Sequence, residues 1–141
     1  MANVSITAAN VVKGSNAVVD EGTAGEALTG GQTACKKTDG KYYKADCDAT
    51  AVTADAHIKE VEGIVLNASV AASQPVDVQT DGDITIGGTI VAGQSYYQSS
   101  TAGSICLFSD LSSTDHVVLI GVGNSTSVLR LAITDADAQV A

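Results

Sequence analysis

Residues of the kinds that do chemistry in proteins are few in this sequence of 141 residues, which has two histidines, His57 and His116, and three cysteines. The familiar catalytic and phosphate-binding patterns are also missing. There is no Gly-x-Ser-x-Gly elbow, no His-Glu-x-x-His, no phosphate loop ending in Gly-Lys-Ser/Thr and no Cys-x-x-Cys. We therefore predict that the chain is not an enzyme and that it uses no cofactor.

Short acidic patterns are the remaining candidates for a metal site. Asp55 and His57 supply at most two ligands, whereas first-row metal sites need three or four. The Asp-x-Asp patterns at residues 46–48 and 135–137 look like fragments of a calcium loop, but neither is followed by the glycine and the late glutamate that complete one. We expect solvated or locally hydrogen-bonded side chains here, and no metal site.

The three cysteines leave an odd one, which argues against a framework of disulfides. Cys35 and Cys47 flank a turn that we predict at Asp39-Gly40. With a two-residue turn, Cys35 lies opposite Lys44, three steps from Cys47, which is too far for a bridge without a bend. We expect three reduced thiols, with a bridge between residues 35 and 47 as the alternative.

The charge balance excludes several classes of partner. The formal net charge is −9, and an acidic surface repels nucleic-acid phosphates and anionic membranes. The longest apolar run, residues 117–122, is too short to span a bilayer, and the first six residues lack the basic and apolar regions of a secretory signal. We therefore expect no nucleic acid and no membrane among the partners.

The basic residues are unevenly placed. Four of the seven lie within residues 36–44, on a predicted β-hairpin around Asp39-Gly40 that also carries two tyrosines. One interpretation is an edge hairpin whose lysines prevent aggregation. The other is a basic surface with aromatic anchors that contacts an acidic partner. The candidate contact residues are Lys36, Lys37, Lys41, Tyr42, Tyr43 and Lys44.

The clearest predicted element covers residues 76–86, where apolar or small residues alternate with polar ones, as in a strand with one buried face. A two-residue turn at Asp81-Gly82 would set Val78 opposite Thr85 and would mix apolar and polar residues on each face. We therefore predict one long, bent strand with Gly82 as a kink or bulge on the buried side. A longer loop with a bulge is the alternative.

The rest of the chain is also predicted to be mostly β, with a loop or helical turn at residues 48–57 and a frayed tail after residue 133. The second half echoes the first, since Gly31-Gln32 matches Gly93-Gln94 and Gly63 matches Gly121. This predicts two small barrel-like or sandwich-like β units, at about residues 20–86 and 87–134, within one β domain of residues 20–141. Common use of glycine turns without duplication is the alternative.

Residues 1–19 carry apolar residues but no helix cap. They suit either an ordinary first strand or an extended N-terminal arm that orders by adding a strand to another chain. In the second interpretation the contact residues are Val4, Ile6, Val11 and Val12, and removal of residues 1–19 costs partner binding but not folding.

Residues 61–86 resemble the head decoration, or cement, proteins of tailed bacteriophages, both the lambda-like group and a related, larger group of small phage capsid proteins. The shared pattern is an apolar residue, glycine, an apolar strand, a short alanine-rich link, an alternating strand and a further glycine. Its positions here are Gly63, residues 64–66, residues 68–72, Val76, Val78 and Gly82.

The larger group also opens with an Ala-Gly-Glu-Ala-Leu-Thr-x-Gly-Gln block, matched by residues 24–32, followed by an Asp-Gly-Lys hairpin, matched at residues 39–41. The resemblance covers roughly residues 20–133. It implies a non-enzymatic viral structural protein that binds the outer surface of the expanded phage head and stabilises the capsid. The implied partners are the major capsid protein of the same virus and further copies of the chain, as a homotrimer rather than a dimer. The implied location is the outer surface of the virion, after synthesis in the host cytoplasm.

The alternative function is a carbohydrate-binding or adhesive β module of a phage fibre or surface protein. Sugar sites usually stack aromatic side chains, and this chain has no Trp, one Phe and four Tyr. The composition therefore favours the structural protein.

Overall fold

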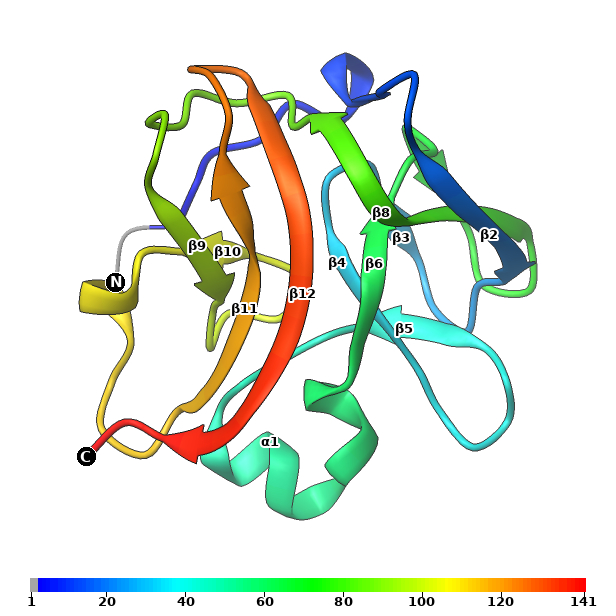
Figure 1. Cartoon of the computed structure of the whole chain (residues 1–141). Helices are drawn as coiled ribbons and strands as arrows, with labels where there is room; N and C mark the ends of the chain where they lie inside the picture. Colours follow the sequence, from blue (N-terminus) through cyan, green and yellow to red (C-terminus); the bar gives the residue numbers. More distant parts are fainter. Residues whose placement is uncertain (1–2) are drawn as a thin grey trace.

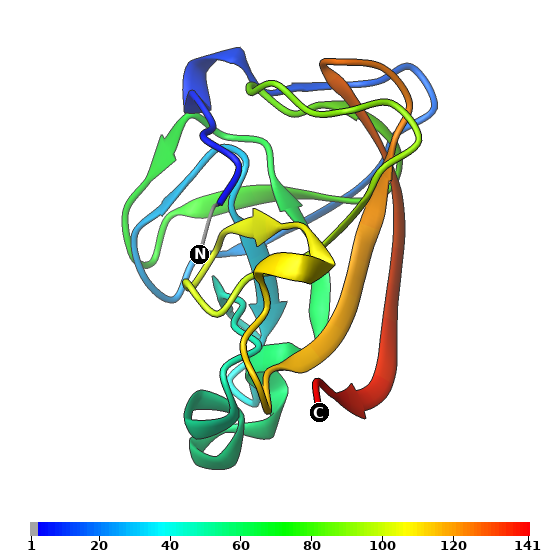
Figure 2. The same ribbon diagram turned by 90° about the vertical axis from the view of Figure 1, so that its left-hand side faces the viewer.

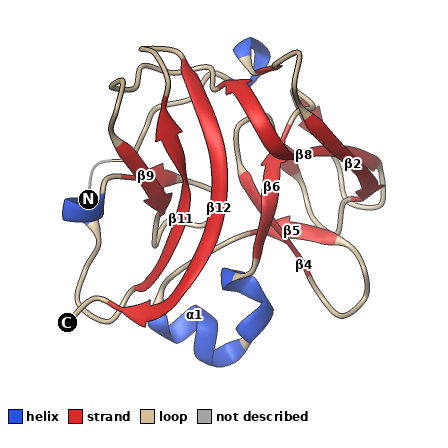
Figure 3. Ribbon diagram, viewed as in Figure 1, coloured by secondary structure: helices blue, strands red, loops and turns tan. Residues whose placement is uncertain are grey.

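The computed structural model describes residues 3–141 and is mostly β, with 45% of the chain in strands and 12% in helices. An antiparallel sheet curls into a half-barrel (Figure 1), and the short helices lie at its margins (Figure 3). The helices are η1 (Ala8–Asn10), α1 (Ala49–Ala54), η2 (Ala56–Lys59) and η3 (Phe108–Asp110). The strands are β1 (Val12–Lys13), β2 (Val18–Thr23), β3 (Leu28–Thr29), β4 (Thr33–Lys36), β5 (Tyr42–Lys44), β6 (Val61–Val65), β7 (Ser69–Val70), β8 (Pro75–Thr85), β9 (Ser95–Gln98), β10 (Ile105–Cys106), β11 (His116–Gly123) and β12 (Val128–Gln139).

The main sheet has the strand order β10-β9-β11-β12-β8-β6-β4-β5, with β1 and β2 paired to β8 outside this path. The order mirrors itself about the β12–β8 pair, because each half contributes a hairpin and then two longer strands. β3 and β7 form a separate two-stranded sheet. Figure 2 shows β11 and β12, in orange and red, as a long ribbon along one side of the molecule.

β8 is the strand that joins the two halves. One of its edges pairs with β1 and then β2, while its other edge is divided between β6, at residues 78–79, and β12, at residues 82–85. The division coincides with Gly82, which has a φ of +89°. A Cβ on Gly82 would lie 2.5 Å from the carbonyl oxygen of Asn16. The prediction of one bent strand with a kink at Gly82, rather than a hairpin, is confirmed.

The side chain of Gln79 stabilises this kink from within. It is fully buried, and its Nε2 donates to the carbonyl oxygens of Asp81, at 3.1 Å, and Asp83, at 2.8 Å. Because both neighbours are acceptors, the amide nitrogen must face them. Its Oε1 is consequently left without a hydrogen-bond partner among residues 3–141.

We predict that Gln79→Met lowers the free energy of unfolding by about 1–2 kcal/mol. The carbonyls of Asp81 and Asp83 lose their shared donor, and this cost exceeds the gain from removing the unpaired Oε1. Chemical denaturation measures the change. Gln94→Met, at an exposed position, is the matched control and should change stability by less than about 0.5 kcal/mol. Equal stability of the two variants would contradict the role of Gln79.

Two hydrophobic clusters fill the two halves. The first lies against β2, β8, β6, β4 and β5, where a parallel bridge joins Ala24 to Tyr42. Its members are Ala24, Leu28, Ala34, Tyr42, Val65, Val70, Val76 and Val78. The second cluster lies against β8, β9, β11 and β12. Its members are Val11, Ile64, Ile84, Ile86, Ile90, Tyr96, Ile105, Val118, Ile120, Leu129 and Leu131.

The described part of the predicted arm packs on its own chain; residues 1 and 2 of that arm lie outside the described residues. The Val4 N–H donates to the Ile105 carbonyl and the Thr7 N–H to the Gly87 carbonyl, both at 2.9 Å. Val11 is 8% exposed within the second cluster, whereas its neighbour Val12 is 57% exposed. These contacts within the chain suit the interpretation as a first strand. The arm that pairs with another chain, and the effect of removing residues 1–19, stay predictions.

We therefore predict that Val11→Ala lowers the free energy of unfolding by about 2 kcal/mol, from two lost methyl groups and the cavity they leave. Val12→Ala, the adjacent exposed valine, should change it by less than about 0.5 kcal/mol. Denaturant unfolding of both variants measures the difference. If the Val11 variant is as stable as the Val12 variant, the segment does not contribute to the fold.

Two details predicted from the sequence are wrong. The β4–β5 turn is longer than two residues, since Lys37 N–H bonds the Lys41 carbonyl, and Cys35 therefore pairs with Tyr43 rather than with Lys44. The tail is not frayed, because β12 continues to Gln139 alongside β11. The predicted helical turn is present as α1.

Candidate functional site

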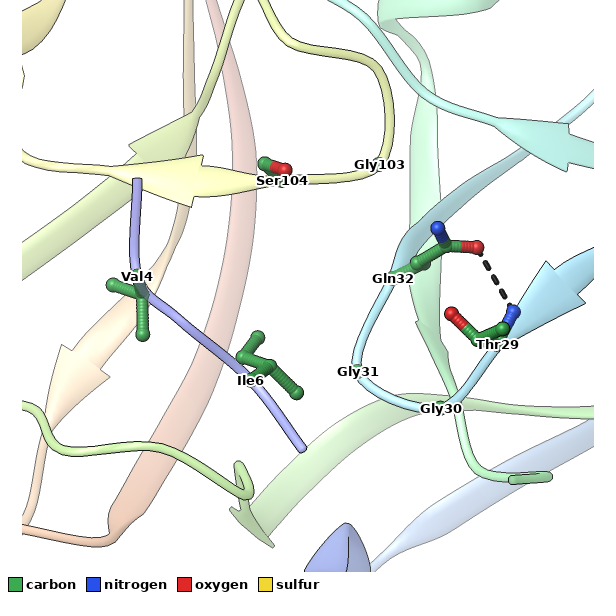
Figure 4. A pocket seen from close by; sticks show the side chains of 8 residues that line it. All are labelled: Val4, Ile6, Thr29, Gly30, Gly31, Gln32, Gly103 and Ser104. Carbon is green, nitrogen blue, oxygen red and sulfur yellow. Dashed lines mark hydrogen bonds between the residues drawn. The ribbon is translucent and has the colours of Figure 1, made fainter. Parts of the chain in front are cut away.

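A cavity in which predicted contact residues gather lies between the N-terminal segment, the turn before β4 and the turn before β10. It has a volume of about 160 Å³. Val4 and Ile6 form one wall; Figure 4 shows Val4 below Ser104 and Ile6 beside the turn at Gly30 and Gly31. The other lining residues are Thr29, Gly30, Gly31, Gln32, Gly103 and Ser104.

The turn before β4 takes its shape from local hydrogen bonds and two glycines. Gln32 Oε1 accepts the Thr29 N–H at 2.9 Å, and Gly31 has a φ of +88°, which favours glycine. A Cβ on Gly30 would lie 2.8 Å from the Ala8 carbonyl oxygen, and one on Gly31 would collide with Ile6. Because neither glycine has a side chain, the N-terminal segment can lie directly on this turn.

The chemistry of the cavity is limited to hydrogen bonding and apolar contact. Its polar side chains are the hydroxyls of Thr29 and Ser104 and the amide of Gln32, opposite the aliphatic Val4 and Ile6. None of the lining side chains is an acid or a base. The cavity can therefore hold a small neutral group, such as one side chain of a partner, but it contains no general base to activate a nucleophile.

The lysine-rich hairpin is less available to a partner than its sequence indicates. Tyr42 is fully buried, and its hydroxyl donates to Asp20 Oδ2 at 3.2 Å. Burial, as the larger cause, and the negative charge of Asp20 together raise the pKa of Tyr42 to about 12. Tyr42 is a core residue, so its prediction as an aromatic contact for a partner is corrected. Tyr43 is half-buried, and its hydroxyl donates to Asp39 Oδ2 at 2.6 Å.

The lysines of the hairpin also have contacts within the chain. The Nζ of Lys36 lies 5.1 Å from the ring centroid of Tyr42, and the Nζ of Lys37 lies 4.6 Å from that of Tyr43. Lys37 in addition forms an ion pair of 3.5 Å with Asp55. Hydrogen bonds from the Tyr43 hydroxyl and the Lys41 N–H hold the pKa of Asp39 below its usual range. The hairpin is thus partly neutralised by neighbouring carboxylates.

The structure does not gather all the predicted contact residues on one surface. Val4 and Ile6 reach the cavity, Val11 lies in the core and Val12 is exposed on β1. Lys44, at the base of the hairpin, lies close to the cavity. Gly103 lines the cavity, and a Cβ built on Gly103 would lie 3.3 Å from Lys44 Cγ. The cavity residues that the sequence did not predict as contacts include Thr29, Gln32 and Ser104. Gln32 was noted only for its match to Gln94, and no pattern in the sequence places Ser104 beside it.

The three thiols are free and fully buried, and no bridge joins residues 35 and 47. Burial raises the pKa of the Cys35 thiol to about 12 and that of Cys106 to about 11, and it raises the pKa of Cys47 still further. Cys47 and Cys106 lie with Leu111 in a small apolar cluster. Since the thiolate is the reactive form, these cysteines are structural.

We predict that the folded protein reacts with less than one equivalent of an aromatic disulfide reagent at pH 8, because buried thiols stay protonated there. After denaturation without reductant, all three thiols should react. The released chromophore measures both values. A denatured count of about one would show a disulfide and contradict the structure.

The histidine and acidic pairs considered above are held by local hydrogen bonds. Asp48 caps α1 by accepting the Thr50 N–H at 2.9 Å, and Lys59 forms an ion pair with Asp135. His57 Nδ1 lies 3.0 Å from Glu60, whose hydrogen bond raises the pKa of His57. Across residues 3–141, no three His, Cys, Asp or Glu side chains are grouped so that they could hold a metal ion. Within the same residues, no helix has the length and apolar character needed to cross a membrane.

Comparison of the sequence with models of known protein families and with curated proteins gave no match.

Proposed function

We propose that this protein is a capsid decoration, or cement, protein of a tailed bacteriophage. In this proposal it binds the major capsid protein on the outer surface of the expanded head and stabilises the shell without catalysis. It acts as a homotrimer rather than a dimer, on virions assembled after its synthesis in the host cytoplasm.

The observation that carries the proposal is the structural position of the pattern at residues 61–86. This stretch forms β6, β7 and β8, and β8 pairs with both β6 and β12 in the main sheet. Both pattern glycines stand where a side chain does not fit, since a Cβ on Gly63 would collide with the Gln79 carbonyl and one on Gly82 with the Asn16 carbonyl. The pattern shared with decoration proteins therefore consists of residues that determine this fold.

The proposal includes two related β units, supported by repeated hydrogen bonds and a repeated bulge. In each half a Gly-Gln turn exchanges two backbone hydrogen bonds of 2.7–2.9 Å with a longer strand. In the first half the Gly31 N–H donates to the Val65 carbonyl, and the Val65 N–H donates to the Gln32 carbonyl. In the second half the Gly93 N–H donates to the Gly123 carbonyl, and the Gly123 N–H donates to the Gln94 carbonyl. The same pairing shift follows in both halves. Between β4 and β6, Ala34 pairs with Gly63 but the next residue, Cys35, pairs with Val61. Between β9 and β11, Tyr96 pairs with Gly121 but the next residue, Tyr97, pairs with Leu119.

The physical properties of the chain suit a cement protein. A clamp needs a stable fold and several contact surfaces but no reactive group, and here the thiols are buried and the cavity is uncharged. Contacts that are weak in one copy become strong when copies are linked through a repeating shell. The exposed Lys36 remains available to an acidic surface, although its neighbours are partly neutralised.

We predict that the purified protein adds regular density to bare, expanded phage heads. Lys36→Glu should weaken attachment by up to about tenfold at low salt, because a charge pair with the shell is lost, and by less at high salt, where charges are screened. Cosedimentation with heads at two salt concentrations measures the effect, and electron microscopy locates the density.

Lys13→Glu is the matched control, since it makes the same charge change at an exposed lysine outside the hairpin. Equal weakening by both variants would mean that net charge, not the hairpin, governs attachment. Absence of any density on the heads of a panel of tailed phages would contradict the proposed function.

A carbohydrate-binding or adhesive module is the second candidate, and one observation favours it. Phe108 is 47% exposed and packs edge-to-face on Tyr97, with ring centroids 5.4 Å apart. Exposed aromatic rings can stack on sugars. A glycan array separates the two functions, because a specific glycan signal that is lost in Phe108→Ala would favour the adhesive module.

A further inference from the structure

The two Gly-Gln turns of the fold have the same backbone geometry. Gly31 has a φ of +88° and Gly93 a φ of +81°. The turn bond is also repeated, since Gln32 N–H donates to the Thr29 carbonyl and Gln94 N–H to the Val91 carbonyl, each at 3.2 Å. Position by position, residues 28–32 therefore correspond to residues 90–94.

The first of these turns is covered by the chain's own N-terminal segment. Ile6 lies against Gly31, and the Ala8 carbonyl lies against Gly30, so both glycines are buried. The covering segment is uncharged, with aliphatic side chains at the alternating positions Val4 and Ile6. It is extended at Thr7 and enters η1 at Ala8. Its apolar side chains pack on the second hydrophobic cluster.

The second turn has no such cover. A Cβ built on Gly93 would have no atom of residues 3–141 within 4 Å, and residues 91–94 are all exposed. Val91 is 61% exposed, more than Val12, Val18 or Phe108. In Figures 1 and 2 this light-green turn lies at one end of the molecule, beside the orange turn between β11 and β12.

The two stretches of sequence that carry the bare turn, at residues 90–94, and the adjacent turn between β11 and β12 are uncharged. No charged residue occurs between Asp83 and Asp110, nor between His116 and Arg130, although the whole chain has a formal charge of −9. The centres of protein–protein interfaces are depleted of charged residues, because burying an unpaired charge is costly. An uncharged end with an exposed valine is therefore suited to contact with an apolar segment.

We propose that residues 90–94 are a docking surface for an extended, uncharged segment of a partner protein, with aliphatic side chains at alternating positions. The segment takes the place at Gly93 that Ile6 takes at Gly31, and it also covers Val91, which stands where the first turn has the exposed Thr29. Ala92 stands where the first turn has Gly30, so the partner backbone lies slightly farther out and contacts the alanine methyl group. The inference rests on the proposed function only for the partner's identity, which is then the capsid shell protein.

A synthetic peptide with the sequence of residues 3–9, Asn-Val-Ser-Ile-Thr-Ala-Ala, is the probe, because it reproduces the chemistry of the covering segment. It is titrated into the full-length, isotope-labelled protein, and backbone amide shifts are followed by NMR. We expect shifts centred on residues 90–94 and 123–127, with an affinity that is on the order of millimolar for so short a peptide. Val91→Asp should weaken binding at least about tenfold, since it puts a charge in the contact.

Val18→Asp is the matched control, because Val18 is also an exposed valine, at 54%, but lies on β2. It should leave the peptide affinity within about twofold of the unchanged protein. No saturable shift, shifts confined to residues 28–32, or equal binding by the Val91 variant would each overturn the inference. The assay contains no phage heads, so its failure is distinct from a failure of the protein to decorate them.

Discussion

The kink in β8 at Gly82 is the constraint on which the rest of the fold depends. A straight strand would offer one continuous edge to one neighbour, whereas the kinked strand gives part of that edge to β6 and part to β12. Each half can then curl around its own hydrophobic cluster while backbone pairing stays continuous between them. The buried amide of Gln79 holds the carbonyls on both sides of Gly82, so the bend has its own internal support.

The N-terminal segment completes this arrangement by covering what the two halves leave open. It bridges to Cys106 at the outer edge of β10, and it lies over the glycines of the first Gly-Gln turn. A segment that is occupied in this way has little free edge to offer a neighbour. If the protein docks on a shell, the surfaces that remain are the outward-facing Val12, the hairpin lysines and the bare turn at residues 90–94.

Sequence reasoning succeeded where one physical rule decided the outcome. The parity of apolar and polar residues around Asp81-Gly82 excluded a hairpin, because only a continuous strand keeps Val78 and Ile84 on a buried side. It failed where tertiary contacts decide. A longer turn at residues 37–41 shifts the pairing of Cys35 by one residue. Tyr42 is buried where it bridges to Ala24, a contact between distant residues that no local pattern encodes. The cavity residues come from three distant segments, so spacing along the chain could not reveal them.

The distribution of charge separates two physical tasks that an attachment protein must perform. Charges act over distance and guide the approach of two surfaces, but they resist burial. In this chain the charged residues avoid the stretches around the second Gly-Gln turn, and the lysine cluster lies on a hairpin elsewhere. A partner can therefore be attracted at one surface and packed against another. Since neither task needs a moving part or a reactive side chain, a fold with buried thiols and an internally braced central strand is sufficient for a clamp whose strength comes from repetition.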